Sequence, residues 1–102
     1  MVRHIVWWML KPEAEGRTAL ENAQLIKQRA ESLLSMVPSL KSVEVSFTFL
    51  PSTLAPVQII LSSTHDDAAG LKAYAEHPAH VAMGKELVSL VTEHRQAIDY
   101  LF

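Results

Sequence analysis

The segment from Val2 to Leu10 is rich in β-branched and aromatic residues and is apolar on both of its alternating sides. Successive side chains of a β-strand point to opposite faces of the sheet. One side of this segment carries His4, Val6, Trp8 and Leu10, and the other carries Arg3, Ile5, Trp7 and Met9. A strand with one face in water alternates between apolar and polar residues, so this segment predicts a sheet that is covered on both faces.

The first half of the remaining chain predicts one helix followed by two strands. Apolar residues at steps of three and four predict a helix over residues 18–36. The side chains expected to face the core are Leu20, Ala23, Ile26, Ala30, Leu33, Leu34 and Val37. Residues 40–50 alternate strictly between apolar and polar and predict a strand, and residues 57–63 predict another. These two strands could pair as a hairpin.

The second half predicts an interrupted helix and a last strand. A short helix is expected to end near Glu76, and proline favours the first position of a new helix, so a second segment should run from Pro78 to about Glu93. Its expected inward residues are Val81, Gly84, Leu87, Leu90 and Val91. Residues 96–102 alternate as a fourth strand. The order predicts one α+β domain over residues 1–102, with a ferredoxin-like βαββαβ plan and both helical regions on one face of a four-stranded antiparallel sheet.

Composition excludes several classes of function. The formal net charge of -2 over 102 residues argues against a nucleic-acid partner, because phosphate binding needs a clustered excess of Lys and Arg. The chain has no cysteine, which excludes disulfides and thiol catalysis and favours a cytoplasmic location. The apolar run from Ile5 to Leu10 is far shorter than the roughly 20 residues that span a bilayer, so neither a membrane partner nor a signal peptide is expected.

Helices of one chain can cover only one face of the predicted sheet. The other face would carry either the His4, Val6, Trp8 side or the Ile5, Trp7, Met9 side of the first strand. Either is too apolar to remain in water. Because a two-fold pair of identical copies is the simplest way to bury such a face, the sequence predicts a homodimer.

Three stretches of the sequence carry a family resemblance: residues 3–13 at the start, residues 71–81 with the sequence LKAYAEHPAHV, and residues 95–100 at the end. The chain resembles the stress-responsive dimeric α/β-barrel family, known as the Dabb domain. The pattern Tyr-x-x-His-Pro-x-His, which begins at Tyr74, is the most specific part. The resemblance implies a ferredoxin-like subunit and a homodimer in which two sheets face each other around a barrel interior.

The same resemblance indicates candidate site residues. Some plant members of the family cyclise polyketides by an aldol condensation without a cofactor. By position, His80 would be the general base, Tyr74 would polarise a carbonyl group, and His4 would lie in the pocket. An imidazole and a phenol can act together as base and acid near neutral pH. The candidate contacts for a ligand are His4, Trp7, Trp8 and His77.

Each candidate also has a structural interpretation. His77 precedes a proline and is expected to cap a helix, and Trp7 and Trp8 could fill the core or the interface instead of contacting a ligand. Tyr74 could be a core residue, and a structural role for His80 is as well supported as a catalytic one. His65 and His94 lie at the ends of elements and are expected to be solvated. The spacing of His77 and His80 makes a weak metal site without a carboxylate, so neither a metal nor a cofactor is expected.

Three functions remain open from the sequence. The first is a family member of unassigned activity whose barrel interior binds a small apolar ligand or is filled. The second is a cofactor-independent enzyme that acts on a small carbonyl or polyketide-like compound through His80 and Tyr74, or a related barrel monooxygenase that acts without metal. The third is a structural module that assembles dimers or larger rings. An open pocket lined by both His80 and Tyr74 would favour the enzyme.

Overall fold

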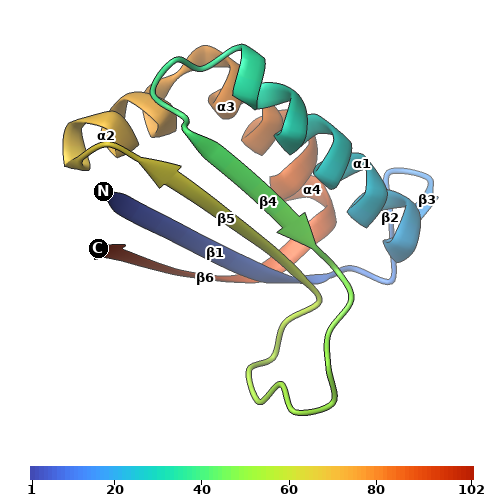
Figure 1. The fold of residues 1–102 in the computed structure, drawn as a ribbon. Helices are drawn as coiled ribbons and strands as arrows, with labels where there is room; N and C mark the ends of the chain where they lie inside the picture. Colours follow the sequence, from blue (N-terminus) through green and yellow to red (C-terminus); the bar gives the residue numbers. More distant parts are fainter.

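The computed structural model describes residues 1–102 and contains a four-stranded antiparallel sheet (Figure 1). The strands are β1 (Val2–Leu10), β4 (Ser42–Ser46), β5 (Ile59–His65) and β6 (Thr92–Leu101), and they lie in the order β4-β5-β1-β6. The first and last strands are therefore neighbours, and the amide of Phe102 donates to the carbonyl of Met1. The predicted ferredoxin-like plan is confirmed, including the pairing of β4 with β5.

A small hairpin leads from β1 into the first helix. Its strands are β2 (Glu13–Ala14) and β3 (Arg17–Thr18), and the turn between them needs positive φ at both central residues, which Gly16 adopts without strain at φ 73°. The helix α1 (Ala19–Ser32) begins at a capping box in which Thr18 and Glu21 each satisfy the other's backbone amide. A 3₁₀ turn, η1 (Leu33–Ser35), ends it.

The second helical region is made of four short pieces. They are α2 (Ala68–Glu76), α3 (Pro78–Met83), the π-helical turn η2 (Gly84–Val88) and α4 (Ser89–Val91). The predicted interruption is present: His77 has an extended backbone with ψ 135°, ends α2 and caps α3. Its Nδ1 accepts a hydrogen bond from the amide of Ala79 at 3.1 Å. His77 is therefore a helix cap, as expected.

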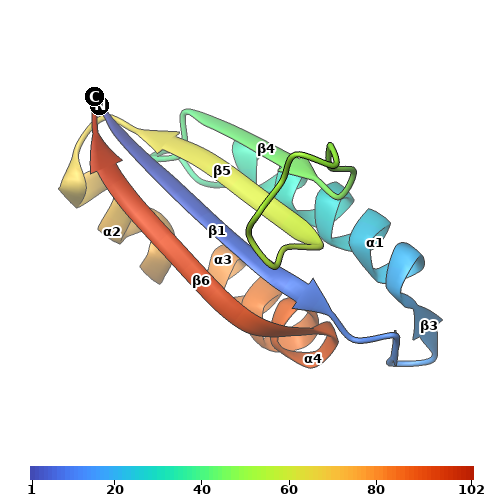
Figure 2. The ribbon, with the colours of Figure 1, turned by 90° about the horizontal axis from the view of Figure 1, so that it is seen from below.

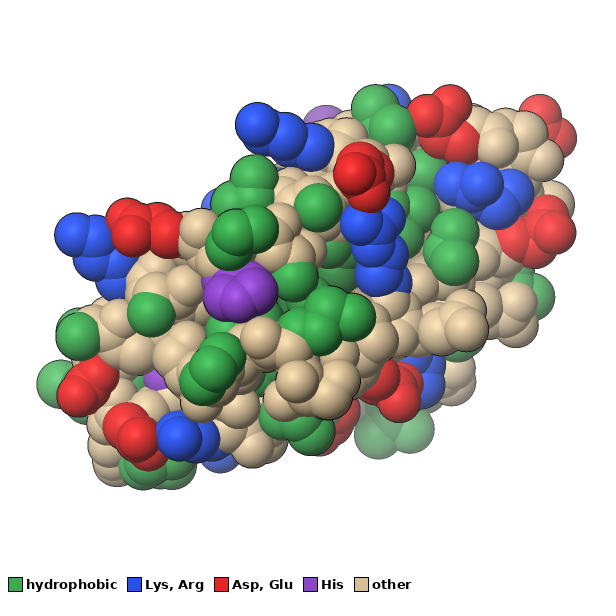
Figure 3. Space-filling view, turned by 90° about the horizontal axis from the view of Figure 1, so that it is seen from above, with side chains coloured by type: hydrophobic (Ala, Val, Ile, Leu, Met, Phe, Trp, Pro, Cys, Tyr) green, Lys and Arg blue, Asp and Glu red, His purple; other side chains and the backbone are tan.

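All the helices cover the same face of the sheet (Figures 1 and 2). The core between the two layers includes Val6, Ile26, Leu61 and Tyr74. Four side chains that we expected to face inward are exposed: Leu20, Leu34, Val81 and Leu90. Leu34 and Leu90 are each adjacent in the sequence to a buried residue. Adjacent residues of a helix point about 100° apart, so these two side chains are turned away from the core. On this side of the molecule, apolar side chains are interspersed with charged ones (Figure 3).

The other face of the sheet has no helix over it (Figure 2). In the register of the strands, Ile5 lies opposite Ile98 on β6, and Trp7 lies opposite Ile60 on β5. Tyr100 belongs to the same face. This uncovered face is the Ile5, Trp7, Met9 side of β1, so the His4, Val6, Trp8 side is the one beneath the helices. No helix of the chain is long and apolar enough to cross a membrane.

The bounds of three strands differ from those that the alternation predicted. The second long strand, β4, ends at Ser46 rather than near residue 50, and β5 runs over Ile59–His65 rather than over residues 57–63. The last strand, β6, begins at Thr92, so the helix before it ends at Val91 rather than near Glu93. The connection between β4 and β5 contains Leu54, whose side chain is 98% exposed. Phe47 nevertheless packs against the core. The residues after Ser46 keep the alternation of a strand, but no neighbouring strand pairs with them.

Candidate functional site

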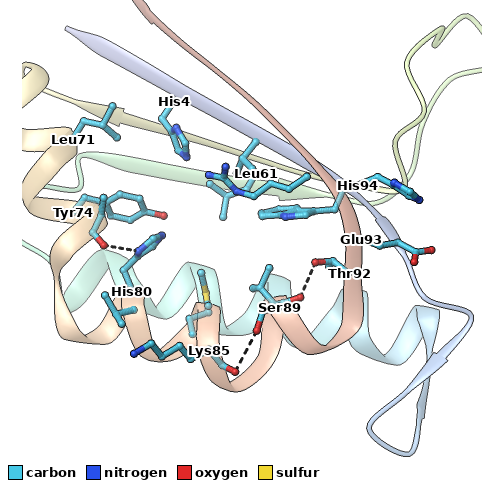
Figure 4. Close-up of a pocket in the computed structure, with 18 residues that line it drawn as sticks. His4, Leu61, Leu71, Tyr74, His80, Lys85, Ser89, Thr92, Glu93 and His94 are labelled. Carbon is cyan, nitrogen blue, oxygen red and sulfur yellow. Dashed lines mark hydrogen bonds between the residues drawn. The ribbon is translucent and has the colours of Figure 1, made fainter.

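A cavity with a volume of about 570 Å³ lies between the sheet and the second helical region (Figure 4). Apolar side chains from both layers form much of its wall: Val6, Trp8, Leu61, Leu71, Met83 and Val88. The polar groups include His4, Tyr74, His80 and Arg95. This cavity lies inside one chain, beneath its own helices, whereas the barrel interior expected from the sequence lies between the sheets of two chains and stays a prediction.

Tyr74 and His80 lie in contact in the wall of this cavity. Their ring centroids are 4.4 Å apart, with the planes tilted by 49°. The Nδ1 atom of His80 is 3.1 Å from the carbonyl oxygen of Ala75. Because a carbonyl can only accept, Nδ1 carries the proton of the neutral ring. The Nε2 atom has no hydrogen-bond partner within the chain, and its lone pair is therefore available to act as a base.

The break between α2 and α3 is what brings these two rings together. Residues six apart on a continuous α-helix point about 120° apart, which would place Tyr74 and His80 on different faces. His77 is extended, and Pro78 begins a new helix with a different direction. The new direction turns His80 back towards the last turn of α2, where the Ala75 carbonyl has lost its helical partner. The proline therefore builds the site, although it lines none of it.

Burial sets the protonation states of the pair. It lowers the pKa of His80 below the ordinary value of 6.5, and the hydrogen bond to Ala75 opposes this while the charges of His4 and Arg95 add to it. Burial also raises the pKa of Tyr74 to about 12. At neutral pH the imidazole is consequently free of its second proton, and the phenol retains its own. This is the combination that a general base and a hydrogen-bond donor require.

His4 faces the cavity from β1 and is held by an acid. Its Nδ1 atom lies 2.5 Å from a carboxylate oxygen of Asp99 on β6. The centroid of its ring is 6.4 Å from that of Tyr74. A carboxylate on Nδ1 fixes the orientation of an imidazole and leaves Nε2 directed elsewhere. In Figure 4 the His4 ring points into the cavity, towards Tyr74 and His80.

His65 is part of this cluster, and the expectation that it is solvated was wrong. Its side chain is fully buried. Nδ1 lies 2.9 Å from the carbonyl oxygen of Ser39, and Nε2 lies 3.0 Å from Oγ of Ser63. Its ring centroid is 4.9 Å from that of Tyr74. The sequence contained the signal, since His65 continues the buried alternation of Ile59, Leu61 and Ser63 along β5.

The other predicted contacts separate into two groups. Trp8 lines the cavity, whereas Trp7 lies on the uncovered face of the sheet and His77 is not among the lining residues. Trp7 and His77 therefore do not line this cavity, and their contact with a ligand stays a prediction. His94 is exposed, as expected, but it lies at the rim of the cavity with φ 56°. Sequence reasoning missed Lys85 and Arg95, which are also in the wall.

The arrangement of the titratable groups favours acid–base chemistry by the side chains themselves. No group of three or more His, Cys, Asp or Glu residues is placed to hold a metal ion. The pair of Tyr74 and His80 instead offers one lone pair and one O–H group at the wall of an apolar cavity. A reacting carbonyl compound could contact both. The chemistry that this permits is proton transfer.

Comparisons with known proteins agree with this architecture. No protein of curated function matches the chain significantly in sequence. A dimeric protein of unknown function with a ferredoxin-like fold, from Bacteroides fragilis, is 30% identical with a TM-score of 0.76, covering 99% of this chain and 95% of its own. A protein of the Dabb family with the same fold, from Mesorhizobium loti, is 24% identical with a TM-score of 0.77, and the match covers 99% of this chain and 95% of its own.

More distant structures share the fold. A hydroxynitrile lyase from Passiflora edulis is 17% identical with a TM-score of 0.76, covering 99% of this chain and 92% of its own. The model of the stress responsive A/B barrel domain matches residues 2–102, which is nearly the whole sequence. The chain therefore belongs to the stress responsive A/B barrel (Dabb) domain family.

Proposed function

We propose that this protein removes a proton from the carbon next to a carbonyl group of a small apolar compound, with His80 as the base and Tyr74 as the hydrogen-bond donor. The observation that carries the proposal is the contact of these two side chains in the wall of a cavity of about 570 Å³. Cavities of about 300–1,000 Å³ hold small organic ligands. The protonation states described above suit both roles.

The steps balance without any further group. Nε2 of His80 takes the proton from the α-carbon, and the electron pair of that C–H bond moves onto the carbonyl oxygen. Tyr74 donates its O–H hydrogen bond to this oxygen and stabilises the enolate. If the enolate carbon attacks a second carbonyl group, a C–C bond forms, and the His80 imidazolium returns its proton to the new alkoxide. An aldol addition results.

Fold analogy adds modest support. A hydroxynitrile lyase has the same fold, which indicates that this architecture can hold a small carbonyl-type compound. At 17% identity the likeness extends to the fold alone. The proposal for this chain therefore rests on its own cavity and side chains.

The direct test is exchange of α-protons for deuterium. Octan-2-one in deuterated buffer would be followed by proton NMR with the purified protein. We expect His80→Ala to reduce the protein-dependent exchange rate by about 100-fold or more, the usual contribution of a general base. Tyr74→Phe should reduce it by a similar factor, because it removes the donor to the developing oxyanion.

His94→Asn is a matched control for the loss of an imidazole. In Figure 4 the ring of His94 lies at the same cavity but points away from Tyr74 and His80. Asparagine tolerates the positive φ of 56° at this position. This variant should exchange octan-2-one at the wild-type rate. Equal rates for the wild type and His80→Ala would refute the proposal.

A binding function without turnover is the second candidate. The mostly apolar wall favours it, since apolar surface retains a ligand whether or not it reacts. Calorimetric titration with octan-2-one distinguishes the two. Heat of binding that is retained in His80→Ala, together with no deuterium exchange in the wild type, would establish binding alone.

We also propose that two copies of this chain pair through the uncovered face of the sheet. Ile5, Trp7 and Ile98 lie there side by side in the strand register. Ile98 is 51% exposed in the single chain. Similar structures are described as dimeric, including the one from Bacteroides fragilis. Sedimentation of the purified protein at micromolar concentration tests this, and a single monomeric species would exclude it.

A further inference from the structure

Two cations in the wall of the cavity have no acidic partner. They are Lys85, at the start of the π-helical turn, and Arg95 on β6. The ion pairs of the chain use other lysines and arginines: Lys27, Arg29 and Lys41. No protein group accepts a hydrogen bond from the Arg95 guanidinium. Its five N–H donors are thus available to a ligand.

Arg95 lines the same cavity as the candidate base His80. Its charge is one of the causes that lower the pKa of His80, whereas Lys85 has no such effect. The Lys85 side chain runs along the outside of its helix, away from the rings of Tyr74 and His4 (Figure 4). Because His80 and Arg95 line one cavity, a ligand bound there can contact both the imidazole and the guanidinium.

The acids near Arg95 are directed elsewhere. Asp99, four residues further along β6, is paired with His4. Glu93 is a lining residue, but its carboxylate points away from Tyr74 and His80 (Figure 4). The histidines at the cavity add no negative charge. Beside an apolar wall, an unpaired guanidinium attracts an anion more strongly than it would in water.

We infer that the compound bound in this cavity is an organic anion, with its apolar body against Trp8, Leu61 and Met83 and its carboxylate paired with Arg95. The planar guanidinium suits a carboxylate because it can donate two parallel hydrogen bonds. The inference deepens the proposed function and rests on it, since it names the substrate class of the same cavity: a carbonyl compound that also carries a carboxylate.

The test compares two probes that share an alkyl chain and differ in charge. Decanoate and decanamide would each be titrated calorimetrically into the wild type, Arg95→Gln and Lys85→Gln. We expect the wild type to bind decanoate at least about tenfold more tightly than decanamide, as for a hydrogen-bonded charge pair. Arg95→Gln should remove this preference without weakening decanamide binding. Lys85→Gln, which removes the same charge at the rim, should retain it.

Two results would overturn the inference. One is equal affinity of the wild type for both probes. The other is an equal loss of decanoate affinity in Lys85→Gln and Arg95→Gln, because it would show a general effect of positive charge and no pairing at Arg95.

The inference and the proposed function can fail separately. A decanoate preference that depends on Arg95, in a protein that does not exchange the protons of octan-2-one, would retain the inference and refute the catalytic proposal. Exchange of the protons of octan-2-one without any preference for decanoate would retain the catalytic proposal and refute the inference. His80→Ala should keep the decanoate preference, since it removes the base and leaves the guanidinium.

Discussion

Replacing His65 with alanine is expected to lower the free energy of unfolding by about 3 kcal/mol at neutral pH. The imidazole makes two buried hydrogen bonds, to the Ser39 carbonyl at 2.9 Å and to Oγ of Ser63 at 3.0 Å. Each contributes about 1 kcal/mol net. The contact with the Tyr74 ring, at a centroid distance of 4.9 Å, adds about another 1 kcal/mol.

The stability contributed by His65 should also depend on pH. Burial lowers the pKa of folded His65 below the ordinary 6.5 of the unfolded chain. As the pH falls through 6.5, the unfolded chain therefore binds a proton before the folded one does. The free energy of unfolding then decreases, by up to about 1.4 kcal/mol for each pH unit between the two pKa values. The contribution is complete above the unfolded pKa.

Urea unfolding followed by far-UV circular dichroism measures both effects. The wild type and His65→Ala would be compared from about pH 7.5 down to about pH 5.5, where histidines titrate and carboxylates remain ionised. The difference in unfolding free energy should be greatest at the higher pH and shrink towards the lower one. His94→Asn, at an exposed histidine, should behave as the wild type does. A difference that stays constant across this range would refute a buried neutral His65.

Three further predictions concern the cavity and the uncovered face. Ile5→Asp should dissociate the dimer in sedimentation experiments and leave the circular dichroism spectrum of a folded protein. Val6→Asp should instead unfold the chain, because Val6 lies beneath the helices with 3% exposure. The reverse pattern would mean that the two faces are misassigned. Gly84→Leu should abolish binding of octan-2-one in calorimetry without lowering Tm, because Gly84 lines the cavity, a Cβ added there meets no atom within 4 Å and φ is helical at -62°. Retained affinity would place the ligand elsewhere. The rate of deuterium exchange should rise with pH to a plateau, with its midpoint below 6.5 because burial lowers the pKa of His80, and a midpoint above 6.5 would exclude that residue as the base.

The alternation of single residues predicted the fold well, because both faces of β1 carry their own signal. The pattern did not show which face the helices cover. The side with His4, Val6 and Trp8 lies beneath them, and the choice follows from how the other strands pair, which depends on contacts far apart in the sequence. Periodicity also predicted too wide a buried face on the helices. Leu20 and Leu34 follow the apolar spacing of three or four residues, yet both are exposed, because the sheet covers a narrower face of the helix.

The candidate site was only partly visible in the sequence. The motif from Tyr74 to His80 indicated two of its members, and the position of His4 indicated a third. The cavity inside the chain was not predicted, because the sequence indicated only an interior between two sheets. Arg95 lies in a stretch that resembles the family, but nothing in the sequence indicated a role at the site: an exposed arginine on an edge strand looks like a solvated residue until the ion pairs of the whole chain are known.

The helix break at His77 explains how a short motif can organise a site from distant strands. On a continuous helix, Tyr74 could face the sheet only if His80 did not. With the break, Tyr74 contacts both His65 on β5 and His80 on α3, at centroid distances of 4.9 and 4.4 Å. Its hydroxyl points into the cavity (Figure 4). His65 and His80 thus have different roles. Nε2 of the buried His65 already has a hydrogen-bond partner, so this residue supports Tyr74, whereas Nε2 of the half-buried His80 is free to perform the chemistry.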